Sequence, residues 1–403
     1  MDHRRRELLA SGAIVLIFLA IQIGALALVG PFEQEGLQEV ENTSDPSLSI
    51  VYLAAILVAT GLMLVALKYG GDEILRLIII FAGAYIALFV FQALVPALVS
   101  VSIAGSSVNV LAWAGALALG IALFVYPEWY VIDAAGVLMG IGASALFGIN
   151  FGILPALVLL SVLAVYDAIS VYGTEHMLTL ASGVMDMRVP VLFVIPLSLS
   201  YSFLESDKPD SVQAESDDAG ETDPASSNPS TDDPGLDVTD HPNPDDIVEP
   251  EARLDVATLN DLGPEGVRNL DRDWLEAIEL DEDDVEELDD DVHETLQDID
   301  GERDALYIGL GDAVIPTVLV TSAAFFVESG PTLSVLGVSA TLPALTAMVG
   351  TLAGLVVLLW LVQQGRAHAG LPLLNGGTIA GYLVGALVSG LSLVEALGLS
   401  SFL

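Results

Sequence analysis

The sequence predicts an all-α polytopic membrane protein with nine transmembrane helices. Hydrophobic residues make up 53% of the 403 positions, and the mean hydropathy is +0.67. Apolar runs of about 20 residues, the length that a helix needs to cross a bilayer, recur along the chain. A soluble fold is not compatible with this pattern, so we expect a multi-pass protein of the cell membrane.

Six of the expected spans precede a long hydrophilic segment. The first follows the basic stretch 3–6, and we interpret it as an uncleaved anchor because it exceeds the 7 to 15 apolar residues typical of a signal peptide. A turn centred on Asn150 separates the fifth span from the sixth. The six predicted spans are 8–30, 48–67, 74–98, 108–125, 131–149 and 152–172.

Two segments after the sixth span differ from a transmembrane helix. Residues 174–188 form an amphipathic pattern, and residues 190–203 are apolar but contain Pro190 and Pro196. A run of roughly 14 residues is too short to cross comfortably, so we expect an interfacial or re-entrant piece there. The last three spans are expected at 305–327, 342–362 and 371–397.

Acidic residues are concentrated between the sixth and seventh spans. The formal net charge is −42, and 37 of the 54 acidic residues lie in 205–304. Residues 205–250 are rich in Asp, Ser and Pro and are expected to be disordered, whereas 254–296 mixes apolar and charged residues and predicts one or two short amphipathic helices. We therefore divide the chain into a six-span region (1–203, including the interfacial segment), an acidic and largely disordered cytoplasmic loop (204–303) and a three-span region (304–403).

The charge also indicates a source and an orientation. An acid-rich, lysine-poor surface is typical of a protein in a salt-saturated cytoplasm, which predicts a halophilic archaeon; an acidic docking segment for a basic partner is the alternative. With nine spans and a cytoplasmic amino terminus, every Lys and Arg of the chain falls on the cytoplasmic side. The positive-inside rule thus predicts a cytoplasmic amino terminus and an extracellular carboxyl terminus.

Several kinds of chemistry are excluded early. The chain contains no cysteine, which rules out disulfides and thiolate metal sites. Its five histidines are scattered and show no zinc-binding spacing. We expect neither a metal nor another cofactor.

Two aspartates lie within predicted spans. Asp312 is roughly 8 residues, or about 12 Å, into the seventh span, and Asp167 is about 5 residues before the end of the sixth, so both lie at similar depth from the same face. Two carboxylates close together in a low-dielectric setting cannot both ionise easily, so one keeps its proton. The ionised member can then activate water while the protonated one polarises a carbonyl, which is the chemistry of an aspartyl protease.

Gly309 and Gly311 precede the second aspartate. Without side chains they allow another backbone to approach, which suits a site that must reach a peptide bond in a helical substrate. The alternative is that these glycines only pack helices together, and that the aspartates make a structural polar contact. An ionisable residue within a span is more often functional, which favours the site.

These residues resemble the motifs of a known family. Tyr166-Asp167 and Gly309-Leu310-Gly311-Asp312 are similar to the YD and GxGD motifs of the presenilin and signal-peptide-peptidase intramembrane aspartyl proteases. Residues 174–192 resemble the amphipathic segment of archaeal presenilin homologues, and the presenilin-like layout of nine spans with one long loop covers most of the chain. Pro372-Leu373-Leu374 is similar to the Pro-Ala-Leu motif of the family, with Leu in place of Ala, a departure that bears on substrate docking.

The resemblance implies roles for individual residues. Asp167 and Asp312 would be catalytic, supported by Tyr166 and by Gly309, Leu310 and Gly311, while Pro372, Leu373 and Leu374 would dock the substrate. The substrates would be transmembrane-helix proteins in the lipid bilayer, cleaved within the span. No nucleic acid, cofactor or obligate subunit is expected.

Two other classes of function remain open. A proton- or sodium-coupled transporter also uses carboxylates within spans, but it predicts two repeated halves with broken helices, and no such repeat is found. A non-catalytic scaffold that recruits partners through the acidic loop is the third class. Asp312→Asn would leave that scaffold working and would abolish proteolysis.

Overall fold

The computed structural model describes most of the apolar part of the chain. The described residues are 3–40, 42–96, 98–103, 106–173, 189–196, 256–268, 305–327, 330–335, 338–362 and 369–400, with the single positions 288, 289, 292 and 295. The predicted amphipathic segment 174–188 and the predicted disordered stretch 205–250 lie outside them.

The chain separates into two units. Residues 1–212 and 305–403 form one, which we call the membrane unit, and residues 213–304 form the other. In the second unit the structure describes the helix α8 (Val256–Arg268), which is interrupted at Gly263, where φ is +65°. Its Leu259 and Val267 are buried, in agreement with the amphipathic helix predicted in this region.

The described part of the membrane unit contains nine apolar helices and one short terminal helix. Seven of the nine are long and apolar enough to cross a membrane, and the other two, α4 and α12, have 16 and 17 residues. The ten are α1 (His3–Gln34), α2 (Ser47–Lys68), α3 (Asp72–Leu94), α4 (Val110–Val125), α5 (Trp129–Asn150), α6 (Ile153–Gly173), α12 (Leu310–Phe326), α13 (Leu342–Val362), α14 (Gly370–Val388) and α15 (Leu393–Ala396).

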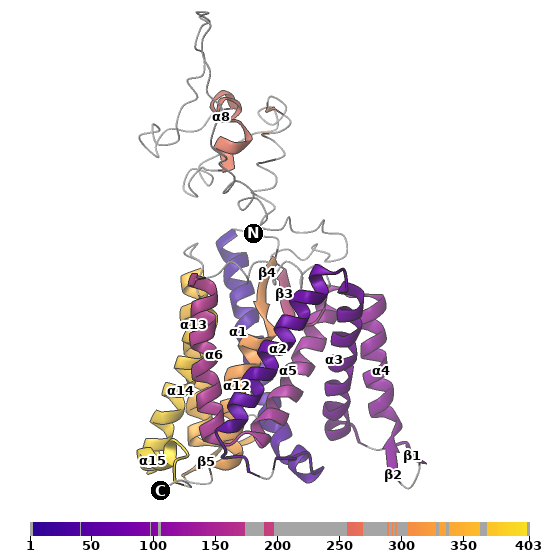
Figure 1. Cartoon of the computed structure of the whole chain (residues 1–403), viewed down its shortest axis with the longest axis vertical. Coiled ribbons are helices and arrows are strands. Elements are labelled where there is room, and N and C mark those ends of the chain that lie inside the picture. Colours follow the sequence, from indigo (N-terminus) through magenta and orange to yellow (C-terminus); the bar gives the residue numbers. More distant parts are fainter. Residues whose placement is uncertain are drawn as a thin grey trace, which may run out of the picture. The chain divides into compact units, whose positions relative to one another are not determined.

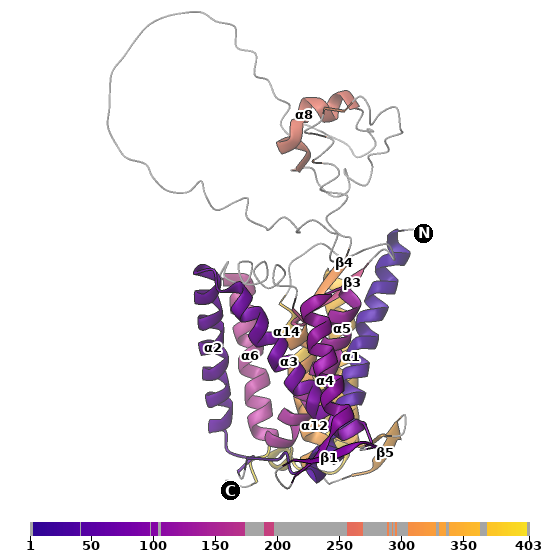
Figure 2. The same ribbon diagram turned by 90° about the vertical axis from the view of Figure 1, so that its right-hand side faces the viewer.

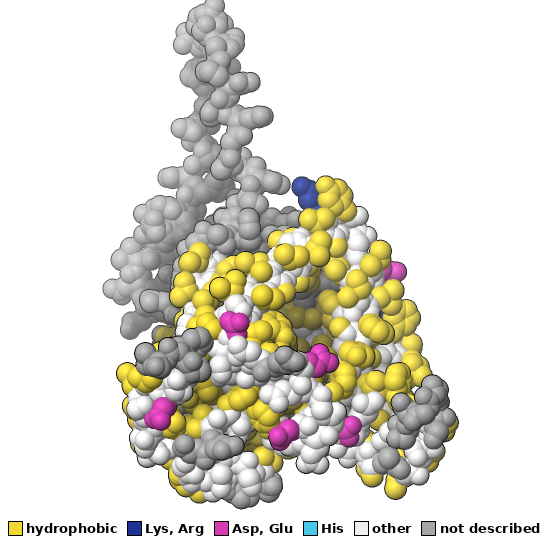
Figure 3. All heavy atoms as spheres, turned by 60° about the horizontal axis from the view of Figure 1, so that its bottom comes forward, with side chains coloured by type: hydrophobic (Ala, Val, Ile, Leu, Met, Phe, Trp, Pro, Cys, Tyr) yellow, Lys and Arg dark blue, Asp and Glu magenta, His cyan; other side chains and the backbone are white. Residues whose placement is uncertain are grey.

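The helices run back and forth between two ends of the membrane unit. The start of α1 lies at the same end as β3 and β4, and α15 lies at the opposite end (Figure 1). Helix α2 stands at the edge of the bundle, where it contacts α3 and α6 (Figure 2). Hydrophobic side chains are abundant on the surface seen from the α15 end, which also carries isolated acidic side chains and a central hollow (Figure 3).

The described part of the chain is mostly helical, as predicted, but it is not all-α, because it also includes three two-stranded antiparallel sheets. Two are hairpins that lead directly into helices, and the third joins segments far apart in the sequence. The pairs are β1 (Ser100–Ile103) with β2 (Ser106–Asn109), β5 (Thr332–Val335) with β6 (Val338–Thr341), and β3 (Leu192–Pro196) with β4 (Ala305–Gly309). Short apolar runs look alike as strand or helix in a hydropathy pattern, which is why the sequence did not indicate them.

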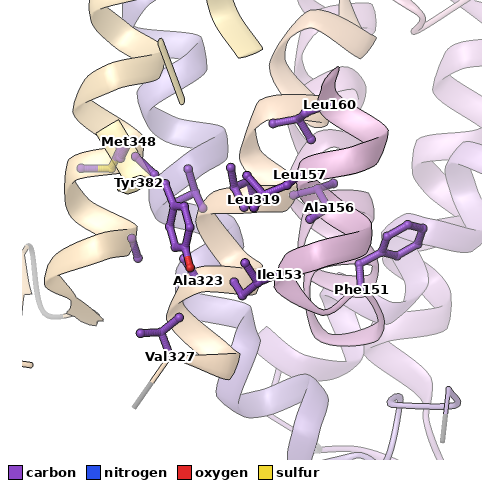
Figure 4. Close-up of a cluster of buried hydrophobic side chains, with 14 of the residues drawn as sticks. Phe151, Ile153, Ala156, Leu157, Leu160, Leu319, Ala323, Val327, Met348 and Tyr382 are labelled. Atoms are coloured by element: carbon purple, nitrogen blue, oxygen red, sulfur yellow. The ribbon is translucent and has the colours of Figure 1, made fainter. Parts of the chain in front are cut away.

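Helix α12 lies in the centre of the membrane unit, where it contacts α1, α5, α6, α13 and α14. Its hydroxyl side chains satisfy carbonyl oxygens on α5 or just after it: Thr321 donates to Ser144 at 2.9 Å, and Ser322 donates to Phe151 at 2.7 Å. Hydrophobic side chains from α6, α12, α13 and α14 pack beside these bonds (Figure 4). The second half of the seventh span is therefore held on α5.

Helices α13 and α14 pack at close range through glycines. A Cβ at Gly350 of α13 would overlap the carbonyl oxygen of Gly377 on α14, and a Cβ at Gly381 would overlap that of Thr346. Such small-residue contacts let the backbones of membrane helices approach closely. The hydroxyl groups of Thr351 and Thr378 lie 2.7 Å apart across the same interface.

Candidate active site

Asp167 lies on α6 and is 7% exposed. Its Oδ2 accepts a hydrogen bond of 3.0 Å from the backbone N–H of Leu371, and the backbone N–H of Gly370 donates to the same carboxylate. These donors belong to the first turn of α14, whose N-terminal N–H groups have no partner within the helix. The start of a helix is a natural place for a carboxylate, because the free N–H groups and the helix dipole both favour negative charge.

Asp312 lies in the first turn of α12, three residues after the N-cap Gly309. Its side chain is partly buried and accepts a hydrogen bond from the backbone N–H of Gly309. This is the half of a capping box in which the third helical residue reaches back to the N-cap. Gly309 has no side chain with which to complete the other half.

Asp312 therefore lies in the first turn of its helix and not two turns into it, as predicted. The apolar run predicted a helix from 305 with this aspartate about 8 residues into it, but α12 begins at Leu310 and the residues before it form the strand β4. β4 pairs with β3, and the N–H of Leu310 continues the pairing with a 2.8 Å bond to the oxygen of Val191. This long-range pairing provides the backbone hydrogen bonds that a helical turn would otherwise provide.

The structure brings the two carboxylates together. Asp167 and Asp312 are near enough to interact electrostatically. Gly370 lies beside both: its N–H donates to Asp167, and a Cβ added to it would lie 3.7 Å from Oδ2 of Asp312. The site thus combines α6, the start of α12 and the start of α14.

The two glycines before Asp312 differ in their surroundings. A Cβ at Gly309 would lie 3.3 Å from Oδ2 of Asp312, which leaves little room for a side chain beside the carboxylate. A Cβ at Gly311 would meet only Cδ1 of Ile315, at 3.9 Å, and Gly311 is exposed. Leu310 between them packs toward Gly140 of α5.

The other predicted site residues border the carboxylates in different ways. Tyr166 precedes Asp167 on α6 and is 40% exposed, so the two neighbours have contrasting environments. Pro372 and Leu373 are partly exposed in the first turn of α14, and Leu374 is buried. The next residue, Asn375, is fully buried and its Nδ2 donates to the oxygen of Leu160 on α6 at 2.9 Å, which ties α14 to α6 below the site.

Sequence reasoning missed Gly370 and Leu371 as site residues. The ninth span was predicted to start at 371, and its site residues were predicted only from the Pro-Leu-Leu sequence that follows. The available signal was that the first residues of a helix expose unpaired N–H groups, which suit a carboxylate. Among the described residues, no cluster of three or more histidine and acidic side chains could hold a metal ion.

Comparisons with known proteins identify the family of this chain. The family described as signal-peptide peptidase, presenilin aspartyl protease matches residues 15–222 and 278–391, which include both aspartates. A solved structure of a presenilin-family intramembrane aspartate protease in the C222 space group is 26% identical, with a TM-score of 0.51, and the match covers 94% of this chain and 99% of that one. A second such structure, in the P2 space group, is 26% identical, with a TM-score of 0.49 and coverage of 93% and 97%. No curated protein matches the sequence.

Proposed function

Because this chain belongs to the signal-peptide peptidase and presenilin family and is an intramembrane aspartyl protease, we propose that Asp167 and Asp312 are its catalytic carboxylates. The position of Gly370 beside both carboxylates is the observation that carries this assignment, since it places both side chains near one short piece of backbone. The N–H groups of Gly370 and Leu371 hold the Asp167 carboxylate in one orientation, as a catalytic group requires.

The pair works by holding one water between its members. The ionised carboxylate takes a proton from the water as the water oxygen attacks the carbonyl carbon of the peptide bond, and the protonated carboxyl transfers its proton to the carbonyl oxygen. The tetrahedral intermediate then breaks its C–N bond while the leaving nitrogen receives the proton that the base had taken. The second carboxyl recovers its proton from the new carboxylic group, so the pair returns to its starting state.

The substrates are transmembrane-helix proteins, as for the family. We assign Gly311 to the substrate side of the site, because it is exposed next to Asp312 and has room for a second backbone. Tyr166 supports Asp167 at the lipid-facing edge of α6. The segment Pro372–Leu374 docks the substrate, and Pro372 is tolerated there because the N–H groups of the first helical turn lack intrahelical partners.

We further propose that all nine apolar helices cross the membrane. Helices of 16 and 17 residues span about 24 to 26 Å, a little less than the roughly 30 Å hydrocarbon core. Each is extended by a strand, β2 before α4 and β4 before α12, which supports a full crossing. The amino terminus is then cytoplasmic and the carboxyl terminus extracellular, in accord with the basic residues.

The loop between the membrane regions is proposed to be cytoplasmic. The division into regions 1–203, 204–303 and 304–403 is supported by the separation of residues 213–304 as a unit of their own. The high acidic content of this loop supports work in a salt-rich cytoplasm, as in a halophilic archaeon. We also propose that the protease works without a cofactor or an obligate subunit; that both carboxylates come from this single chain supports the proposal.

The assignment is tested with the purified full-length protein in high-salt detergent and a single-span reporter. Wild type should cut within the span, whereas Asp167→Ala and Asp312→Ala should each lower the rate at least about 10³-fold, since neither carboxylate can activate water alone. Glu395→Gln, at the far end of the membrane unit, is the control and should cut like wild type. If both aspartate variants retain the wild-type rate, the assignment is wrong.

A further inference from the structure

A third aspartate is linked to the site through β3 without belonging to the carboxylate pair. Asp133 is in the second turn of α5, and its Oδ1 accepts a 2.8 Å hydrogen bond from the backbone N–H of Val194 in β3. Backbone N–H groups at membrane depth need a partner, because lipid offers none. Asp133 thus satisfies an N–H of β3 that is not used in the pairing with β4.

The same face of α5 receives the side chains of β3. Phe193 is fully buried against Gly136, one turn after Asp133, where a Cβ would lie 2.8 Å from Cε1 of the ring. Val194 is 2% exposed and packs in a cluster with Ile132 and Ala135 of α5. A hydrogen bond at Val194 and the packing of the Phe193 ring against Gly136 therefore hold β3 on α5 at two successive residues.

β3 in turn holds the residues that lead to Asp312. β4 has β3 as its strand partner in the described structure, with Leu192 opposite Gly309 and Val194 opposite Tyr307. Gly309 then donates its N–H to Asp312. The chain of contacts from Asp133 through β3 and β4 to Gly309 is continuous, and each step is a hydrogen-bonded one.

We propose that Asp133 is a positioning residue, which fixes β3 on α5 and so sets the place of Gly309 and Asp312 relative to Asp167. The proposal rests on the catalytic assignment above. The body of α12 is independently fixed on α5 by Thr321 and Ser322, so losing the Asp133 bond should displace the first turn of α12 without unfolding the bundle. The role requires an acceptor atom at position 133 and does not require a charge.

The test compares Asp133→Asn, which keeps an acceptor oxygen, with Asp133→Leu, which has similar size and no acceptor. With the reporter assay, Asp133→Leu should lower kcat about tenfold or more with KM within about twofold, and Asp133→Asn should stay within about threefold of wild type. Gly136→Ala, which pushes Phe193 away from α5 by another route, should also lower kcat. Glu395→Gln serves as the control, and Asp312→Asn checks the catalytic assignment in the same assay.

A second measurement reports on β3 without relying on activity. The chain has no cysteine, so Val194→Cys with Tyr307→Cys forms a clean pair across the strands, close enough to be joined by mild oxidation in membranes. Cross-linking should be fast in the wild-type and Asp133→Asn backgrounds and at least about threefold slower with Asp133→Leu. The proposal is overturned if Asp133→Leu cross-links and cleaves like wild type, or if Asp133→Asn is as impaired as Asp133→Leu. Full cleavage by Asp312→Asn would instead refute the catalytic assignment. The cross-linking result alone would then decide whether Asp133 positions β3.

Discussion

At the scale of single residues, the site depends on a position that has no side chain, Gly370. Gly370 lies against both carboxylates, and a Cβ there would be 3.3 Å from Cδ2 of Leu358 and 3.7 Å from Oδ2 of Asp312. We predict that Gly370→Ala cuts within a few fold of wild type, because a methyl group nearly fits, while Gly370→Val lowers kcat on the order of 10- to 100-fold by pushing the carboxylates apart. Steady-state cleavage of the reporter measures both.

Gly376 provides the matched control on the same helix. A Cβ there would have no neighbour within 4 Å, so Gly376→Val should cut like wild type. Equal losses in the Gly370→Val and Gly376→Val proteins would show that the effect comes from valine in α14 and not from crowding of the carboxylates.

The two glycines of the GxGD-like sequence should respond differently to substitution. Gly309 has φ −66° and ψ 135°, which any residue can adopt, so the effect of Gly309→Ala comes from crowding at Oδ2 of Asp312 and should be a lower kcat. Gly311 has open space, so Gly311→Leu should leave the enzyme folded and raise KM about tenfold by obstructing the substrate. Kinetics over a range of reporter concentrations separates the two effects, and a fall in kcat alone for Gly311→Leu would contradict the substrate-side assignment.

At the scale of elements, local pattern was enough wherever a helix is long and continuously apolar. The predicted span 342–362 coincides with α13, and six other predicted starts lie within two residues of a helix start, the exceptions being 8 for α1 and 305 for α12. The ninth span was predicted to reach 397, but α14 ends at Val388, and the chain turns through Gly390 at φ +88° before α15. The Ser-Gly pair at this turn was the overlooked signal, since glycine commonly ends a helix in this conformation.

Elements that depend on distant partners could not be predicted in the same way. β4 is a five-residue apolar run whose strand conformation requires β3, more than 100 positions earlier in the chain. The meeting of Asp167 with the first turn of α14 likewise depends on how α6 and α14 pack, and no periodicity in either segment encodes it. The aspartates themselves were evident because an acidic residue within an apolar run is rare.

The interface between α13 and α14 carries a prediction about stability. α14 carries the donors to Asp167, and its close approach to α13 depends on glycines such as Gly381. Gly381→Ala should lower the free energy of unfolding by about 1–3 kcal/mol, because its methyl group would overlap the carbonyl oxygen of Thr346. Thermal unfolding in detergent measures the change, with the exposed Gly376→Ala as control; unchanged unfolding of Gly381→Ala would show that the interface can relax.

At the scale of the whole molecule, the alternating helices place both predicted active-site aspartates near one end of the membrane unit. This end also contains the start of α1, with its three arginines, and the strands β3 and β4 (Figure 1). The opposite end contains α15 and both hairpins. If these two ends face opposite sides of the membrane, the chain crosses it an odd number of times. Orientation and the number of spans can therefore be addressed as one question.

Cysteine labelling answers that question directly, because the natural chain has no cysteine and gives no background. Glu33 at the end of α1, Glu73 at the start of α3 and Val394 in α15 are exposed positions for single cysteines. In intact cells a membrane-impermeant maleimide should label Glu33→Cys and Val394→Cys, and should label Glu73→Cys only after the cells are opened. The reverse pattern would mean that the protein is inserted the other way. Labelling of Glu33→Cys without Val394→Cys would mean an even number of crossings, and one of the short helices α4 or α12 would then have to turn back within the bilayer.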